Sequence, residues 1–180
     1  MVETIHATEE VSAYPPAPDG LSDAALALDA DMIWQRIEQW VAHRWSERTA
    51  TWLVHGPGEW VPPLTPATIT DVEVWRHEVS GAGYVAATAP PSPFGGLEFS
   101  EPGPWRITAI VGAAPVPPAA QEAFRRLAEY SAAEAGVVAA SQVSRTEGDL
   151  TESYSRNAAW MAKAMQNSGA ADLLRPYRRA

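Results

Sequence analysis

Apolar residues recur at helical spacing near the start of the chain. Between Asp31 and Arg48 they fall every three or four positions, and polar residues occupy the opposite side. This spacing predicts an amphipathic helix over Asp31 to Arg48. A second helix is predicted from Ala119 to about Ala140, because a pair of prolines opens a long stretch rich in alanine.

The middle of the chain, residues 49–112, changes to short β-rich runs separated by glycine and proline. Apolar and polar residues alternate from Trp105 to Val111 and within Ile69 to Trp75. Prolines at the ends of the runs favour a small antiparallel sheet over a parallel one. Together the patterns predict an α+β fold, in which a helical body carries a small antiparallel β-rich element and an extended C-terminal helical arm.

The C-terminal segment combines short helices with a basic and aromatic end. Asn167 to Gly169 has the composition of a helix stop, and Pro176 ends the next short helix because it has no N–H to donate. Tyr177 then stands among arginines. Aromatic rings and arginines are enriched where a chain anchors in a partner's pocket, so the segment is a candidate docking group. The alternative is that it folds back on the chain's own core.

Composition divides the chain into three segments. Residues 1–21 are acidic and end in a proline-rich turn, which predicts a flexible N-terminal arm. Residues 22–145 contain the two long helices and the β-rich middle and form the expected main domain. Residues 146–180 form the expected docking arm, and the polar run from Ser141 to Thr151 is expected to be a hinge before it.

Charge is distributed unevenly around a formal net charge of −9. No lysine or arginine precedes Arg36, whereas cations outnumber acids after Ser153. Ends of opposite sign favour head-to-tail contacts between copies, or docking on an oppositely charged partner. The net negative charge opposes phosphate contacts, so tight duplex binding is not expected. No window approaches the ~18 apolar residues of a membrane span, and no membrane contact is expected.

The sequence offers little for catalysis or metal binding. It has no cysteine, and its four histidines lack the paired spacing of a zinc site. Glu59, Asp71, Glu73 and His77 are the residues that could form an acid–base site, yet alternating acidic residues on a strand more often form its solvated face. The Gly-x-Ser-x-Gly motif is missing too. We therefore expect no enzyme activity, catalytic residue, metal or cofactor.

The stretch from Ser168 to Arg179, after Ser153-Tyr154-Ser155, resembles the C-terminus of the head–tail connector (adaptor) proteins of long-tailed phages and gene transfer agents. The order of the upstream elements agrees with that family over roughly Leu28 to Arg179, while the acidic start of the chain departs from it. The resemblance implies a structural virion protein that joins the DNA-filled capsid to the stopper and tail.

The resemblance further implies a dodecameric ring beneath the portal protein, in the virion neck between capsid and tail, after synthesis in the host cytoplasm. Genomic DNA would pass through its channel without specific binding. The implied partners are the portal protein and the stopper or tail-completion protein. The expected portal-binding residues are Trp160, Leu173, Leu174, Arg175, Tyr177, Arg178 and Arg179. The expected tail-side contacts are Pro90, Pro91, Pro93 and Phe94. The alternative function is a small module that binds nucleic acid or protein through the basic C-terminal tail.

Overall fold

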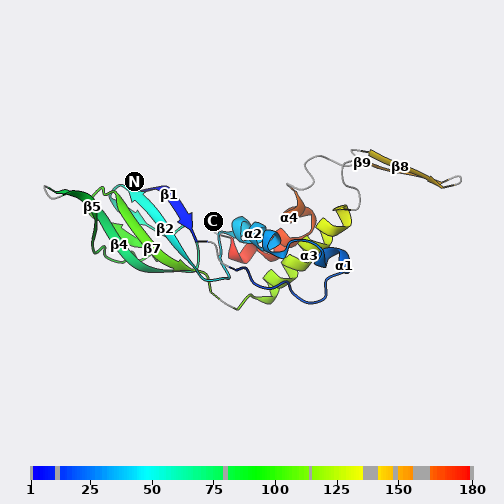
Figure 1. Ribbon diagram of the computed structural model, residues 1–180, viewed down its shortest axis with the longest axis horizontal. Coiled ribbons are helices and arrows are strands. Elements are labelled where there is room, and N and C mark those ends of the chain that lie inside the picture. The colour runs from blue at the N-terminus through cyan, green and yellow to red at the C-terminus, as the bar shows by residue number, and fades with distance from the viewer. Residues whose placement is uncertain are drawn as a thin grey trace. The chain divides into compact units, whose positions relative to one another are not determined.

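The computed structural model describes residues 2–10, 13–78, 81–113, 115–135, 142–147, 150–155 and 163–178 (Figure 1). The chain forms two compact units, and each draws on two separate stretches. The first unit combines Met1–Tyr14 with Ala42–Pro115, and the second combines Pro15–Val41 with Val116–Ala180. No helix in the described ranges has both the length and the apolar character needed to cross a membrane.

The first unit is built on a five-stranded antiparallel sheet with the strand order β1-β2-β7-β4-β5 (Figure 1). Its strands are β1 (Glu3–Glu9), β2 (Arg48–His55), β4 (Ala67–Glu78), β5 (Gly81–Ala86) and β7 (Trp105–Val111). A second, two-stranded sheet pairs β3 (Gly58–Trp60) with β6 (Leu97–Phe99). The two edges of the large sheet are therefore β1 and β5.

The core of the first unit lies between these two sheets. Alternate residues of β2 and β7 are buried, as the period of a strand requires when one face is covered. The rings of Trp52 and Trp60 meet edge to face at 5.5 Å, and Phe99 stacks on Trp105 at 4.6 Å. Aromatic pairs of this kind contribute about 0.5–1.5 kcal/mol beyond the area they bury. The β-rich middle of the chain therefore holds a core of its own.

An ion pair between the buried Arg44 and the partly exposed carboxylate of Glu9 holds β1 in this unit. Arg44 donates from Nε and from one terminal nitrogen to the two carboxylate oxygens of Glu9, at 2.7 and 2.8 Å. The hydrogen bonds from Arg44 lower the pKa of Glu9, although burial of the carboxyl group opposes the shift. Arg48 lies 3.8 Å from the same carboxylate and over the ring of Tyr14. The acidic start of the chain is thus tied to two arginines that follow the helix.

The second unit contains the helices. They are α1 (Asp23–Leu26), α2 (Ala30–Val41), α3 (Pro118–Ala135), α4 (Ala164–Asn167), α5 (Ala170–Leu173) and the 3-10 helix η1 (Arg175–Tyr177). The ring of Trp34 on α2 packs against Phe124 on α3 with centroids 4.8 Å apart. Between α3 and α4, β8 (Gln142–Glu147) pairs antiparallel with β9 (Leu150–Ser155). The polar run predicted to be a hinge therefore contains paired strands.

The predicted fold class, a helical body carrying a small β-rich element, is wrong. The structure is mostly antiparallel sheet, and α1, α4 and α5 have only four residues each. The helix predicted from Asp31 to Arg48 ends at Val41, because Ala42 takes a left-handed φ of 55° and the chain enters a strand at Arg48. The β-rich runs were also underestimated, since β4 alone is 12 residues long.

The start of the chain differs from its prediction as well. Residues 1–21 were expected to form a flexible arm, yet Glu3–Glu9 is a strand of the large sheet. The functional division into residues 1–21, 22–145 and 146–180 stays a prediction, and its boundaries differ from those of the two compact units.

Candidate interaction surfaces

The C-terminal segment folds onto its own unit. Leu174 is 0% exposed, and Met165 and Ala170 are also buried. Both α4 and α5 contact α3, where the side chain of Asn167 donates to the hydroxyl of Tyr130 at 3.2 Å. Gly169 takes a left-handed φ of 75° and turns the chain between the two short helices. The alternative left open by the sequence, a tail folded on its own core, therefore describes α4 and α5.

The expectation that Leu174 fills an apolar pocket of a partner does not hold in this conformation, because its side chain is already enclosed. Leu173, one position earlier, is half-buried. Leu174 follows directly after α5, and neighbouring residues of a helical turn point about 100° apart, so the two leucines face different directions. Of the two leucines, only Leu173 has accessible side-chain surface that a partner could contact.

The cations at the end of the described chain are accessible. Arg175 and Arg178 are exposed, and Tyr177 between them is half-buried. The guanidinium carbon of Arg178 lies 5.1 Å from the centroid of the Trp40 ring. A cation over an indole ring is held in place by the quadrupole of the ring. The structure thus brings Arg175, Tyr177 and Arg178 together as a basic end group, while Trp160 and Arg179 lie outside the described residues.

The loop expected to contact the tail side lies between β5 and β6 in the first unit. Phe94 is 74% exposed at its turn. Pro90, Pro91 and Pro93 are exposed, and Pro91 forms an isolated bridge with Leu97. An exposed large aromatic ring on an ordered turn is the kind of side chain that anchors protein interfaces.

Several hydrogen bonds fix the turn that carries Phe94. The hydroxyl of Ser92 bonds the carboxylate of Glu59 and accepts from the backbone N–H of Phe94 at 3.0 Å. The backbone N–H of Ser92 donates to the carbonyl of Gly96 at 2.8 Å. A Cβ on Gly96 would lie 1.9 Å from the carbonyl oxygen of Trp60, so only glycine allows this close approach. The turn is thereby held against a core tryptophan.

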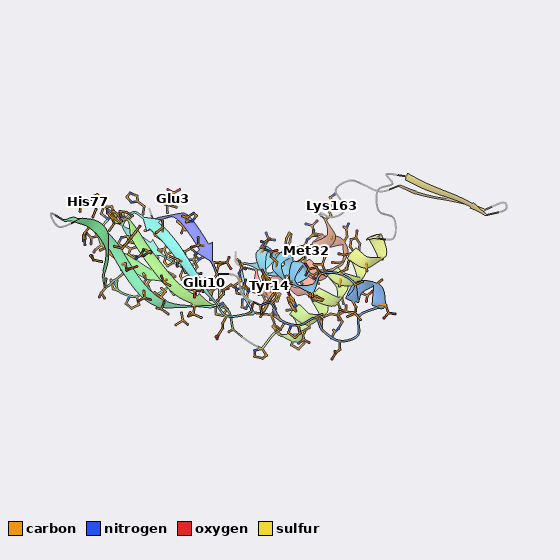
Figure 2. All side chains as sticks on the ribbon, viewed as in Figure 1. Glu3, Glu10, Tyr14, Met32, His77 and Lys163 are labelled. Carbon is orange, nitrogen blue, oxygen red and sulfur yellow. The ribbon has the colours of Figure 1, made fainter. Side chains whose placement is uncertain are left out.

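An ionic and aromatic cluster occupies the face of the large sheet that points away from β3 and β6. Arg106 donates to both carboxylate oxygens of Glu73, at 2.5 and 2.8 Å, and lies 4.3 Å over the ring of Tyr84. Trp75 meets Tyr84 edge to face at 5.0 Å. Figure 2 shows the neighbouring His77 at the end of the sheet where β4 leads to β5.

This cluster adjoins a shallow hollow of about 420 Å³. The hollow is lined by Thr51, Asp71, Val72, Glu73, Ala86, Arg106 and Thr108. Hydrogen bonds from Arg106 lower the pKa of Glu73, which keeps this carboxylate charged and ion-paired. A general base needs a pKa near the working pH, and a carboxylate held charged by arginine is poorly suited to that task.

The remaining acid–base candidate lies on a different sheet. Glu59 belongs to β3, where it is directly opposite Glu98 and bonded to Ser92. The three candidate carboxylates therefore do not lie together. Asp71 and Glu73 line the hollow, whereas Glu59 lies beside Ser92 at the base of the loop that carries Phe94. Among the described residues, no group of three or more His, Cys, Asp or Glu side chains is placed to hold a metal ion.

Two features of these surfaces cannot be predicted from local sequence patterns. The cluster of Arg106, Glu73 and Tyr84 depends on the register of the three strands β4, β5 and β7. The alternation of charged and apolar residues in β4 and β7 indicates only which residues share a face of the sheet. The contact of Arg178 with Trp40 joins residues far apart in the chain, and no local signal indicates it.

Comparisons with known proteins found no match. No protein-family model, curated protein or solved structure is significantly similar to this chain.

Proposed function

We propose that this chain is a structural protein, a head–tail connector that joins the portal of a DNA-filled capsid to the stopper or tail-completion protein. One observation carries the proposal. Each compact unit presents its own candidate recognition group, Phe94 on the first and the basic end group on the second. A protein that joins two others needs two such groups.

The basic end group is the proposed portal contact. Arg175 and Arg178 are exposed and set on a folded base, so their guanidinium groups can donate to carboxylates or carbonyl oxygens of a partner. Tyr177 and Leu173 supply half-buried apolar surface beside them. Leu174 supports this surface from inside its own unit instead of entering the portal.

The turn with Phe94 is the proposed contact toward the tail. Its backbone is already ordered by Ser92 and Gly96, so little conformational entropy is lost when the ring enters a pocket. The nearby carboxylates Glu59 and Glu98, opposite each other on β3 and β6, favour a pocket with a basic rim.

The proposed setting is a dodecameric ring in the virion neck, with DNA passing through the channel. Its support is the resemblance of the C-terminal sequence to connector proteins. Weak contacts between copies would be held in register by the portal, so the ring forms on its partner.

Co-sedimentation with DNA-filled heads tests this function. The purified chain is expected to pellet with heads that contain the portal and to stay in the supernatant with capsid shells that lack it. Charge reversal of Arg175 and Arg178 to Glu is expected to abolish pelleting, whereas Lys163→Glu, an exposed cation of the same unit, is expected to have little effect. Equal binding to both kinds of shell would contradict the proposal.

A further inference from the structure

The large sheet ends on one side in β5, and this edge is open. Antiparallel strands alternate between residues that bond their neighbour and residues whose backbone groups point away. The N–H of Ala87 donates to the carbonyl of Val72 at 2.9 Å, whereas the N–H of Trp75 points to the other side of β4 and donates to Pro104. By this alternation, the N–H and C=O groups of Ala82, Tyr84 and Ala86 point away from β4.

These outward groups find no backbone partner within the described part of the chain. The edge also lacks the usual protection against pairing, because β5 reads Gly-Ala-Gly-Tyr-Val-Ala and contains no charge and no proline. The opposite edge is different. There β1 carries acidic residues and a break in register between Thr4 and His6.

We propose that the β5 edges of two free chains pair antiparallel about a two-fold axis, which makes one continuous sheet from both copies. The axis passes between Tyr84 and Tyr84 of the second copy. Ala82 then lies opposite Ala86 of the second copy, and the reverse pair follows by symmetry. In this register the outward N–H and C=O groups of Ala82, Tyr84 and Ala86 all form hydrogen bonds with the second copy.

Side chains fit this register. Val85 is 42% exposed, and it would lie opposite Gly83 of the second copy, which has no side chain to obstruct it. A Cβ at Gly83 would meet nothing within 4 Å, so the space beside it is open to a neighbour. On the other face, the Tyr84 ring is already ordered by Arg106 and Trp75, and two such rings would pair across the axis.

The pairing follows from the geometry of the edge and does not depend on the connector function. A ring of identical copies uses head-to-tail contacts, whereas a two-fold contact closes on itself. The β5 pair therefore belongs to the unassembled chain and covers the open edge there. One strand pair is small beside the ~1,600 Å² of a stable interface, so the dimer is weak and must open readily.

Disulfide trapping tests the pairing. Because the sequence contains no cysteine, any disulfide must form between the introduced thiols. Ala82→Cys and Ala86→Cys proteins are oxidised separately and as a mixture, then separated without reductant. In the proposed register, opposite residues have Cα atoms about 5.5 Å apart, within disulfide range. In the Ala82→Cys protein alone, the two introduced thiols would be about 14 Å apart along the strands. We expect at least about tenfold more linked dimer in the mixture, because disulfides require Cα atoms within about 7 Å.

A proline variant provides the second measurement. Ala86→Pro removes an outward N–H without touching the bonds to β4. It is combined with Tyr84→Cys, which places the thiols of both copies at the axis, and is expected to reduce linked dimer at least about tenfold. Ala7→Pro, the same substitution at an outward position of β1, is combined with Tyr84→Cys as the control and should leave the yield unchanged.

Three results would overturn the proposal. The first is equal linking of Ala82→Cys alone and of the mixture, which would mean unordered collisions. The second is no linked dimer at all at high protein concentration, which would leave the edge to a strand of a different protein. The third is undiminished linking in Ala86→Pro while circular dichroism shows an intact sheet.

Discussion

Arg178 lies over the ring of Trp40, with its guanidinium carbon 5.1 Å from the ring centroid. The contact ties the end of the described chain to α2, which lies far from it in sequence. Together with the enclosed Leu174, it makes the C-terminal segment part of the second unit's fold. The basic end group is therefore a preformed surface and does not need to fold on a partner.

The enclosure of Leu174 predicts a loss of stability when its side chain is cut back. Leu174→Ala is expected to lower the free energy of unfolding of the second unit by about 2–5 kcal/mol, as for other buried leucines. Leu173→Ala, at the half-buried neighbouring position, should cost clearly less. Urea denaturation followed by tryptophan fluorescence measures both. Equal costs would mean that Leu174 is not enclosed as described.

The Glu9–Arg44 ion pair predicts a pH-dependent contribution to stability. The pKa of Glu9 is lowered in the folded chain, so the contribution is fully present above the unfolded value of 4.5 and is lost as pH falls through the lower folded value. Glu9→Gln is expected to lower the free energy of unfolding by about 1 kcal/mol at pH 7, because it replaces the carboxylate that accepts two hydrogen bonds from Arg44 with a neutral amide.

The comparison of the two proteins across pH is the check on that prediction. Thermal unfolding of the native chain and of Glu9→Gln should differ most near neutral pH and converge below the folded pKa of Glu9. Glu10→Gln, at the neighbouring exposed position, is the control. A difference that stays constant down to the lowest pH would show that the charge of Glu9 is not responsible.

The close approach of Gly96 to Trp60 predicts an unequal pair of glycine substitutions. Gly96→Ala forces a Cβ to within 1.9 Å of a backbone oxygen, and we expect a loss of about 1–3 kcal/mol from the resulting backbone shift. Gly83→Ala meets open space and should be near neutral. Differential scanning calorimetry compares them, and a neutral Gly96→Ala would contradict the packing of the loop against Trp60.

The charge of the chain predicts weak binding to DNA. With a net charge of −9, the chain should bind duplex DNA with a Kd above roughly 10⁻⁵ M at physiological salt, because it repels the phosphate backbone. Gel shifts at several salt concentrations measure this. Sub-micromolar binding with a steep salt dependence would favour the alternative function, a nucleic-acid-binding module that uses the basic tail.

Local pattern was enough to predict some of the fold. The strand from Trp105 to Val111 is confirmed with the predicted bounds, since alternation over a half-buried strand is a local signal. The strand Glu3–Glu9 was missed because its sequence is polar and all its residues are exposed. It is held by pairing with β2 and by Arg44, and neither can be read from neighbouring residues.

The candidate surfaces also include one feature that local sequence predicts and others that depend on tertiary packing. The exposure of Phe94 follows from its place in a proline- and glycine-rich loop, which local composition identifies. The burial of Leu174 and the exposure of Arg178 depend on how the C-terminal segment packs on its own unit. Two adjacent leucines in a sequence do not indicate which of them is buried. Tertiary packing decides that choice.

Separate binding to heads and to tails tests the central claim, that the chain bridges two partners through different units. The native chain, Phe94→Ala and the Arg175→Glu, Arg178→Glu double variant are each incubated with purified portal-containing heads and with purified tails. We predict that the double variant binds tails alone, that Phe94→Ala binds heads alone, and that Ile5→Ala, an exposed apolar control in the first unit, binds both. Loss of neither contact, or loss of both by either variant with its fold intact, would contradict the account.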